Sequence, residues 1–134
     1  MIYENDYLRE ISFPVGGIGT GSIGVAGNGR LIDWEIFNRP NKGSLNGFSH
    51  IAVRVKKSDG QILTKVLNGD LDKDLSGQYS KVTFNGFGYG PSSRTMCAFE
   101  HFKNCSFNGE FPIATITFSE ENFPLKVIMR VFNP

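Results

Sequence analysis

The stretch that decides the fold class is HIAVRVKKSDGQILTKVL, at residues 50–67. Apolar and polar residues alternate on both sides of a short polar segment, and this period of two is typical of half-buried β-strands. Ile51, Val53 and Val55 share one predicted face of the first run, with Arg54 and Lys56 on the opposite face. The polar segment at residues 58–61 supplies a hairpin turn, and residues 62–67 return as the partner strand.

Three further runs continue this pattern at residues 80–84, 113–118 and 125–132, and the last two form a predicted pair. In the last run, Ile128 and Phe132 point away from their apolar neighbours, which predicts burial on both faces for part of its length. The 16 glycines and 12 phenylalanines of the chain favour short strands joined by tight turns.

The whole chain, residues 1–134, is therefore predicted to form a single all-β domain, an antiparallel β-sandwich whose completeness the sequence leaves open. The only helix that we expect is a single turn near residues 92–102. Residues 27–29 (GNG) come nearest to a flexible linker but are too few to separate two domains. The apolar strand at the end of the chain, with no polar tail, indicates a polypeptide that is cut short there.

Composition argues against several classes of function. The 14 basic and 13 acidic residues give a net charge of +1, so the basic excess typical of nucleic-acid-binding proteins is absent. No apolar run reaches the roughly 18 residues of a membrane span. The N-terminus lacks the basic and apolar regions of a secretory signal, which predicts a cytoplasmic protein.

The two cysteines, Cys97 and Cys105, match neither a redox motif nor a zinc motif. We expect free, half-buried thiols in adjacent strands, with a disulfide as the alternative. The acidic run at residues 70–74 fails as a calcium loop because the required glycine and the final glutamate are missing. We therefore predict no metal and no cofactor.

A glycine-rich stretch, FPVGGIGTGSIG, occupies residues 13–24. Its second half matches the dinucleotide pattern G-x-G-x-x-G, but Pro14 interrupts the run before it and no helix-forming segment follows. We predict instead a glycine-laced strand that another backbone approaches closely. Substitution of Gly17 or Gly19 by alanine should then lower stability.

The stretch GRLIDWEIFNRP, at residues 29–40, holds the only tryptophan of the chain. Its alternation predicts that Trp34 faces the core together with Ile32 and Ile36, while a sugar-stacking platform is the alternative. Candidates for a carbohydrate or domain interface are Trp34, Arg39 and, in the aromatic and glycine-rich loop at residues 84–91, Phe87 and Tyr89.

Candidates for catalysis are scarce. His50 and His101 lie in predicted strands, where a lone histidine is usually structural. A glycosidase needs two carboxyl groups that face each other across the sugar. The acids in aromatic surroundings are Asp33, Glu35, Glu100 and Glu110, and their spacing does not identify a pair. We predict no catalytic residue in this chain.

The glycine-rich motif at residues 13–21 resembles the opening motif of glycoside hydrolase family 116, which includes the non-lysosomal glucosylceramidase, or bile-acid β-glucosidase. The block DWEIFNRP at residues 33–40 looks like the next block of the bacterial members. Residues 110–114 and 123–127 are similar to later blocks, and residues 132–134 resemble the start of a block that runs on. The resemblance covers nearly the whole chain, in order.

The resemblance implies an N-terminal β-sandwich that packs on a C-terminal (α/α)6 catalytic domain of the same polypeptide. It also implies hydrolysis of β-glucosides, sometimes β-xylosides, with retention, by a glutamate nucleophile and an aspartate acid/base that both belong to the catalytic domain. The chain falls short of the family's full N-terminal region, and an unpaired edge strand could drive dimerisation.

Two other functions stay open at this point. An independent carbohydrate-binding module would need an exposed aromatic strip. A small standalone enzyme would need two carboxyl groups roughly 5–9 Å apart in a cleft.

Overall fold

The computed structural model describes residues 1–36, 39–40, 49–70 and 100–133. Nearly all regular structure in these residues is β-strand. In chain order the elements are β1 (Ile2–Glu4), the 3₁₀ helix η1 (Asn5–Glu10), β2 (Ser12–Gly17), β3 (Gly21–Ala26), β4 (Leu31–Ile36), β5 (Ala52–Lys56), β6 (Ile62–Gly69), β7 (His101–Phe102), β8 (Asn104–Glu110), β9 (Ile113–Ser119) and β10 (Val127–Phe132).

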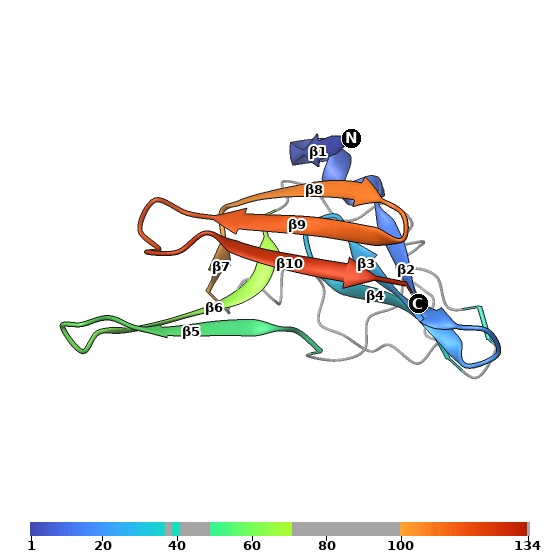
Figure 1. The fold of residues 1–134 in the computed structure, drawn as a ribbon, viewed down its shortest axis with the longest axis horizontal. Coiled ribbons are helices and arrows are strands. Elements are labelled where there is room, and N and C mark those ends of the chain that lie inside the picture. The colour runs from blue at the N-terminus through green and yellow to red at the C-terminus, as the bar shows by residue number, and fades with distance from the viewer. Residues whose placement is uncertain (37–38, 41–48, 71–99, 134) are drawn as a thin grey trace, which may run out of the picture.

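The described strands form three sheets, in the orders β1-β8-β9-β10, β2-β3-β4 and β5-β6-β7. Neighbouring strands are antiparallel, except that β6 and β7 pair in parallel. Figure 1 shows β8, β9 and β10 stretched along the molecule, with the β2–β3 hairpin reaching out at one end and the β5–β6 hairpin at the opposite end. The sheets share one core, so the predicted all-β, antiparallel sandwich is confirmed.

The core is centred on aromatic rings. The centroid of the Phe102 ring lies 5.6 Å from that of Phe118 and 5.1 Å from that of Phe123. Tilted and edge-on ring pairs at such distances add to the free energy gained by burial. The buried members of the core are Leu8, Phe13, Val25, Leu67, Phe102, Phe107, Ala114, Ile116, Phe118 and Phe123. Each of the three sheets contributes to this set, so the sheets depend on one another for burial.

The β5–β6 hairpin follows the sequence-based prediction except at Ile51, which lies just before β5 and is 47% exposed. Val53 and Val55 pack against the core, and Val55 pairs with Leu63 across the hairpin. At the turn, Gly60 has a φ of 87° and its N–H donates to the Lys57 carbonyl at 3.0 Å. Turn chemistry and alternation together therefore specified this unit correctly.

Strand β10 alternates as expected but is buried on one face only. Val127, Met129 and Val131 are half-buried against the core. Ile128 and Phe132, on the opposite face, are 53% and 63% exposed. The predicted burial of both faces is wrong, because apolar residues in a strand do not by themselves show whether a second layer covers them.

Strand β4 agrees only in part with the predicted facing of its side chains. Ile32 is 5% exposed and belongs to the buried core, as predicted, but Leu31, predicted on the opposite face, also packs against the core. The register against β3 shifts after Ile32, and Asp33 has a φ of 49°. A β-bulge of this kind re-aims the side chains that follow. Trp34 and Ile36, predicted to face the core together with Ile32, are half-buried.

The β3–β4 turn at residues 27–29 is buried, although loops usually lie at the surface. A Cβ on Gly29 would lie 2.6 Å from the Phe118 ring. The Asn28 side chain donates to the Gly69 carbonyl at 3.1 Å, and the Asn28 backbone carbonyl accepts from the Gly69 N–H at 2.8 Å. This segment therefore joins the sheets and is not the flexible linker that its composition suggested.

The glycine-rich stretch forms the β2–β3 hairpin, so the helix N-terminus that a dinucleotide motif requires does not follow it. The predicted close approach is present at Gly21, where φ is 88° and a Cβ would lie 2.5 Å from the Glu35 carbonyl oxygen. At Gly17 a Cβ would meet only the Thr20 hydroxyl at 3.4 Å, and at Gly19 nothing lies within 4 Å. The prediction is wrong for Gly17, where neither φ nor packing requires glycine, but it agrees with the structure at Gly19, whose φ of 81° strains any residue that has a Cβ.

The described helical turn is η1, near the N-terminus. The single turn predicted near residues 92–102 falls mostly on residues 92–99, which lie outside the described residues, as does the predicted strand at residues 80–84, and the described residues 100–102 contain strand β7. Among the described residues, no helix is long and apolar enough to span a bilayer.

We expect Gly29→Ala to destabilise the domain more than Gly60→Ala, although both glycines have left-handed φ angles, 88° and 87°. A Cβ at Gly60 meets nothing within 4 Å, so only backbone strain of about 1 kcal/mol applies. At Gly29 the same strain adds to a collision with buried atoms, and the expected loss is about 3 kcal/mol. Denaturant melts measure the difference, and equal losses would contradict the role given to the buried turn.

Candidate functional site

The four residues predicted for a carbohydrate or domain interface are not gathered into one described site. Trp34 is half-buried on β4, and Arg39 is exposed just after that strand. Phe87 and Tyr89 lie outside the described residues, so an aromatic strip that includes them stays a prediction.

The candidate acids differ in environment. Asp33 is 6% exposed and accepts a hydrogen bond from the Ser12 hydroxyl at 2.6 Å. Gly24 lies between them in the sheet, and a side chain there would collide with the Ser12 hydroxyl. Asp33 is thus engaged in joining β2 to β4. The other acids are Glu35, which is half-buried, and Glu100 and Glu110, which are exposed.

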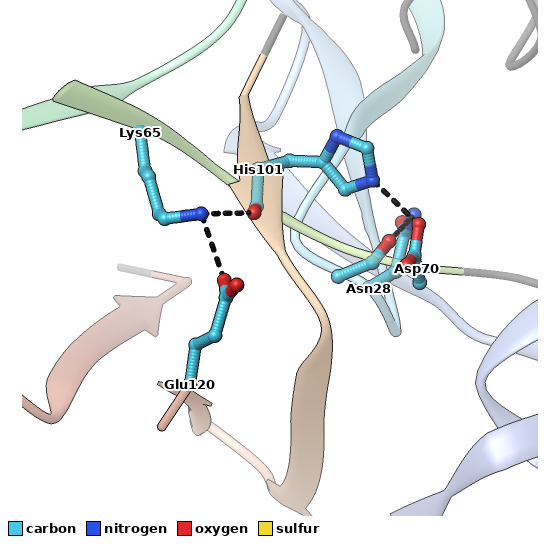
Figure 2. A network of polar contacts seen from close by, with 6 residues as sticks. Asn28, Lys65, Asp70, His101 and Glu120 are labelled. Atoms are coloured by element: carbon cyan, nitrogen blue, oxygen red, sulfur yellow. Dashed lines mark hydrogen bonds and ion pairs between the residues drawn. The ribbon is translucent and has the colours of Figure 1, made fainter. Parts of the chain in front are cut away.

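A polar network surrounds β7 (Figure 2). The His101 ring nitrogen Nε2 lies 2.5 Å from an Asp70 carboxylate oxygen, and the Asp70 N–H donates to the Phe102 carbonyl at 3.0 Å. These bonds hold the end of β6 to β7, which agrees with the structural role expected for His101. His50 differs from its prediction, because it lies just before β5 and not in a strand.

The second half of the network is an ion pair between Lys65 and Glu120 (Figure 2). Lys65 Nζ lies 2.8 Å from Glu120 Oε2, with side chains 13% and 10% exposed, and donates to the His101 carbonyl at 3.0 Å. The hydrogen bond from Lys65 lowers the pKa of Glu120, against the opposing effect of burial. The same ammonium group lies 5.8 Å from the centre of the Phe102 ring. The pair therefore links β6 to the segment after β9, close to the aromatic core.

Cys105 on β8 is a free, half-buried thiol, as predicted, while Cys97 lies outside the described residues. Burial, together with the negative charges of Asp70 and Glu4, raises the pKa of Cys105 to about 12. The thiol is therefore protonated at neutral pH and unsuited to act as a nucleophile. Within the described part of the chain, no group of three or more His, Cys, Asp or Glu side chains is placed to hold a metal ion.

The sequence matches a family model over residues 12–134, and the model describes the N-terminal domain of glycosyl-hydrolase family 116, β-glucosidase 2. The chain belongs to this family. A comparison with curated proteins finds no match. Family 116 membership confirms the resemblance carried by the sequence motifs, and it implies a C-terminal catalytic domain as the partner of this N-terminal domain.

Sequence reasoning missed one surface of the family 116 domain. Ile18, at the tip of the β2–β3 hairpin, is 106% exposed, and Phe111 and Phe132 are 75% and 63% exposed. The glycines around Ile18 led to a prediction about the backbone and none about the isoleucine side chain. The absence of charged residues on both sides of Ile18 was the sequence signal that could have identified this exposed apolar surface.

We expect Glu120→Gln to destabilise the family 116 domain by about 1–2 kcal/mol at neutral pH, because it removes the charge that accepts from Lys65. The matched control is Glu121→Gln, which changes an exposed neighbour and should be nearly neutral. Denaturant melts of the parent and both variants measure these changes.

The same pair predicts a pH dependence. Because the pKa of Glu120 is lower in the folded domain than in the unfolded chain, its contribution is present above the unfolded pKa and is lost as pH falls through the folded pKa. Parent and Glu120→Gln should therefore converge in stability as the pH falls through the lowered pKa of Glu120. A gap that does not narrow as the pH is lowered would contradict the ion pair as its cause.

In a Cys97→Ser background, Cys105 should react with iodoacetamide roughly 100-fold or more slowly in the native family 116 domain than in denaturant. The raised pKa leaves little thiolate at neutral pH, and the thiolate is the reactive form. Mass spectrometry of timed samples gives both rates. Equal native and denatured rates would show that the thiol is open to solvent and normally acidic.

Proposed function

We propose that this chain is the non-catalytic N-terminal domain of a retaining, glucosylceramidase-like β-glucosidase and that it supports the catalytic domain in the hydrolysis of β-glucosides. The match of the family 116 N-terminal model to residues 12–134 carries this proposal. Retention requires two carboxyl groups about 5 Å apart. The proposal assigns both of them to the catalytic domain.

The roles of the described acids support this assignment. Asp33 is used in a buried hydrogen bond with Ser12. The exposed Glu110 carboxylate accepts from the Asn108 amide at 3.3 Å, within the same strand. The carboxyl groups of Asp33 and Glu110 therefore each have a structural contact, on different parts of the fold.

A carbohydrate-binding module is the second candidate. The observation that favours it is that Trp34 is half-buried and Arg39, five residues later in the chain, is exposed. A half-buried indole could still present one face to a sugar ring.

A dimer is a separate element of the proposal. Strand β10 is the outermost described strand of its sheet, and edge strands can pair with a second copy of the chain.

The purified 134-residue chain should not hydrolyse aryl β-glucosides, whereas the natural polypeptide that contains the catalytic domain should. Release of p-nitrophenol measures turnover, and NMR of the first sugar product tests retention of configuration. Turnover by the 134-residue chain that disappears in Asp33→Asn or Glu110→Gln would overturn the non-catalytic role. Saturable binding of a β-linked gluco-oligosaccharide, lost in Trp34→Ala, would favour the second candidate.

A further inference from the structure

Strand β4 contains one residue too many for regular pairing with β3. Asp33 and Trp34 together stand opposite the single residue Ile23, because the pairing register shifts at this point. Asp33 also has a φ of 49°, in the left-handed region that strains a residue with a Cβ. A strained bulge persists only where the surrounding structure holds it. Contacts of the bulge with the rest of the domain must therefore offset this strain.

The bulge reverses the alternation of side chains along β4. Leu31 pairs with Val25 and packs against the core. Regular alternation from Leu31 would place Asp33 and Glu35 on this same face, where burial of a carboxylate is costly. With the extra residue, Glu35 pairs instead with Ser22, on the face of β3 opposite to that of Val25. The bulge therefore keeps the acids of β4 off the core face.

A buried hydrogen bond crosses β3 and ends at the bulge. Asp33 is 6% exposed, and its carboxylate accepts from the Ser12 hydroxyl on β2 at 2.6 Å. Between these two residues β3 passes at Gly24, where a Cβ would lie 3.1 Å from Asp33 Oδ2 and would collide with the Ser12 hydroxyl. Hydrogen bonds to a charged acceptor are about twice as strong as neutral ones. The Ser12–Asp33 bond is therefore suited to hold the strained backbone at Asp33.

Trp34 follows Asp33 directly, so the backbone of the bulge sets the direction of its side chain. The residue is half-buried, and its indole nitrogen Nε1 is buried. Tryptophan side chains near a surface usually bury the apolar body and turn the polar tip towards water. In this domain the polar edge of the ring is turned inward, and this orientation has to be held by the backbone that carries it.

We propose that Asp33 is the positioning residue of Trp34. Its hydrogen bond with Ser12 holds the left-handed bulge, and the bulge holds the indole with its N–H inward. A partner that contacts Trp34 would therefore depend on Asp33 without touching it. This role goes beyond the proposed function and does not rest on it, because neither a sugar nor a catalytic domain enters it.

Trp34 is the only tryptophan of the 134-residue chain, so tryptophan fluorescence reports this site alone. Asp33→Ala removes the acceptor and disfavours the left-handed backbone, whereas Asp33→Asn removes the charge but keeps an acceptor and tolerates that backbone. We expect Asp33→Ala to change the emission maximum of Trp34 and its quenching by acrylamide, and Asp33→Asn to retain both parent values. In Asp33→Ala the amides of residues 33–35 should exchange with deuterium about ten- to a hundredfold faster, which corresponds to loss of a hydrogen bond to a charged group.

Two further variants keep the test decisive if circular dichroism shows that Asp33→Ala does not fold. Ser12→Ala removes the donor and Gly24→Ala displaces the bond, and both residues lie outside β4. Both variants should shift the fluorescence of Trp34 away from the parent values. The matched control is Ser58→Ala, which removes an exposed hydroxyl in the β5–β6 turn and should leave the spectrum unchanged.

Parent-like fluorescence and exchange in a folded Asp33→Ala variant would overturn the positioning role. Parent-like values in both Ser12→Ala and Gly24→Ala would also overturn it, because the bulge would then not need the bond. An Asp33→Asn variant that behaves like Asp33→Ala would overturn it as well, since the charge and not the held backbone would then control Trp34. None of these measurements depends on turnover of a β-glucoside, so their outcome is independent of the test of the proposed function.

Discussion

The close packing of one buried turn against the aromatic core is the constraint on which the other packing depends. At Gly27 a Cβ would lie 2.5 Å from the Leu8 carbonyl oxygen, and at Gly29 one would lie 2.6 Å from the Phe118 ring. Elements η1, β6 and β9 therefore meet at a turn without bulky side chains. A buried turn is tolerated only when its polar groups are satisfied, and Asn28 meets this need through its two hydrogen bonds with Gly69.

The polar side chains around this junction serve the fold. Asp33 joins β2 to β4 through Ser12, and Lys65 holds Glu120 at the edge of the aromatic core. The Cys105 thiol is kept protonated by burial and neighbouring negative charge. Each of these three groups therefore contributes to packing or to pairing between elements.

Glycine has two different roles in this molecule. At Gly21 and Gly29, the strands and the core leave no space for a side chain, so the residue is required by internal packing. At Gly17, the domain leaves that space unfilled, beside an isoleucine that has no contact to bury it. The first role stabilises the sandwich, and the second leaves the β2–β3 tip open, with no charged side chain between residues 11 and 29.

The sequence by itself determined the strands and their turns where the signal is local. The alternation around Val53 and Val55 and the glycine at position 60 specified the β5–β6 hairpin, and the motif at residues 13–21 indicated the family. No residue of a functional surface could be assigned with the same certainty, because the predicted aromatic strip depends on residues far apart in the chain.

Only the tertiary structure decided which faces are covered. It packed Leu31 against the core although its neighbour Ile32 is also buried, left Ile128 exposed, and buried the turn at residues 27–29. Periodicity is a property of neighbouring residues and can be read along the chain. Burial depends on which distant segments arrive at a given face, and a single register shift at Asp33 changes the direction of the side chains that follow.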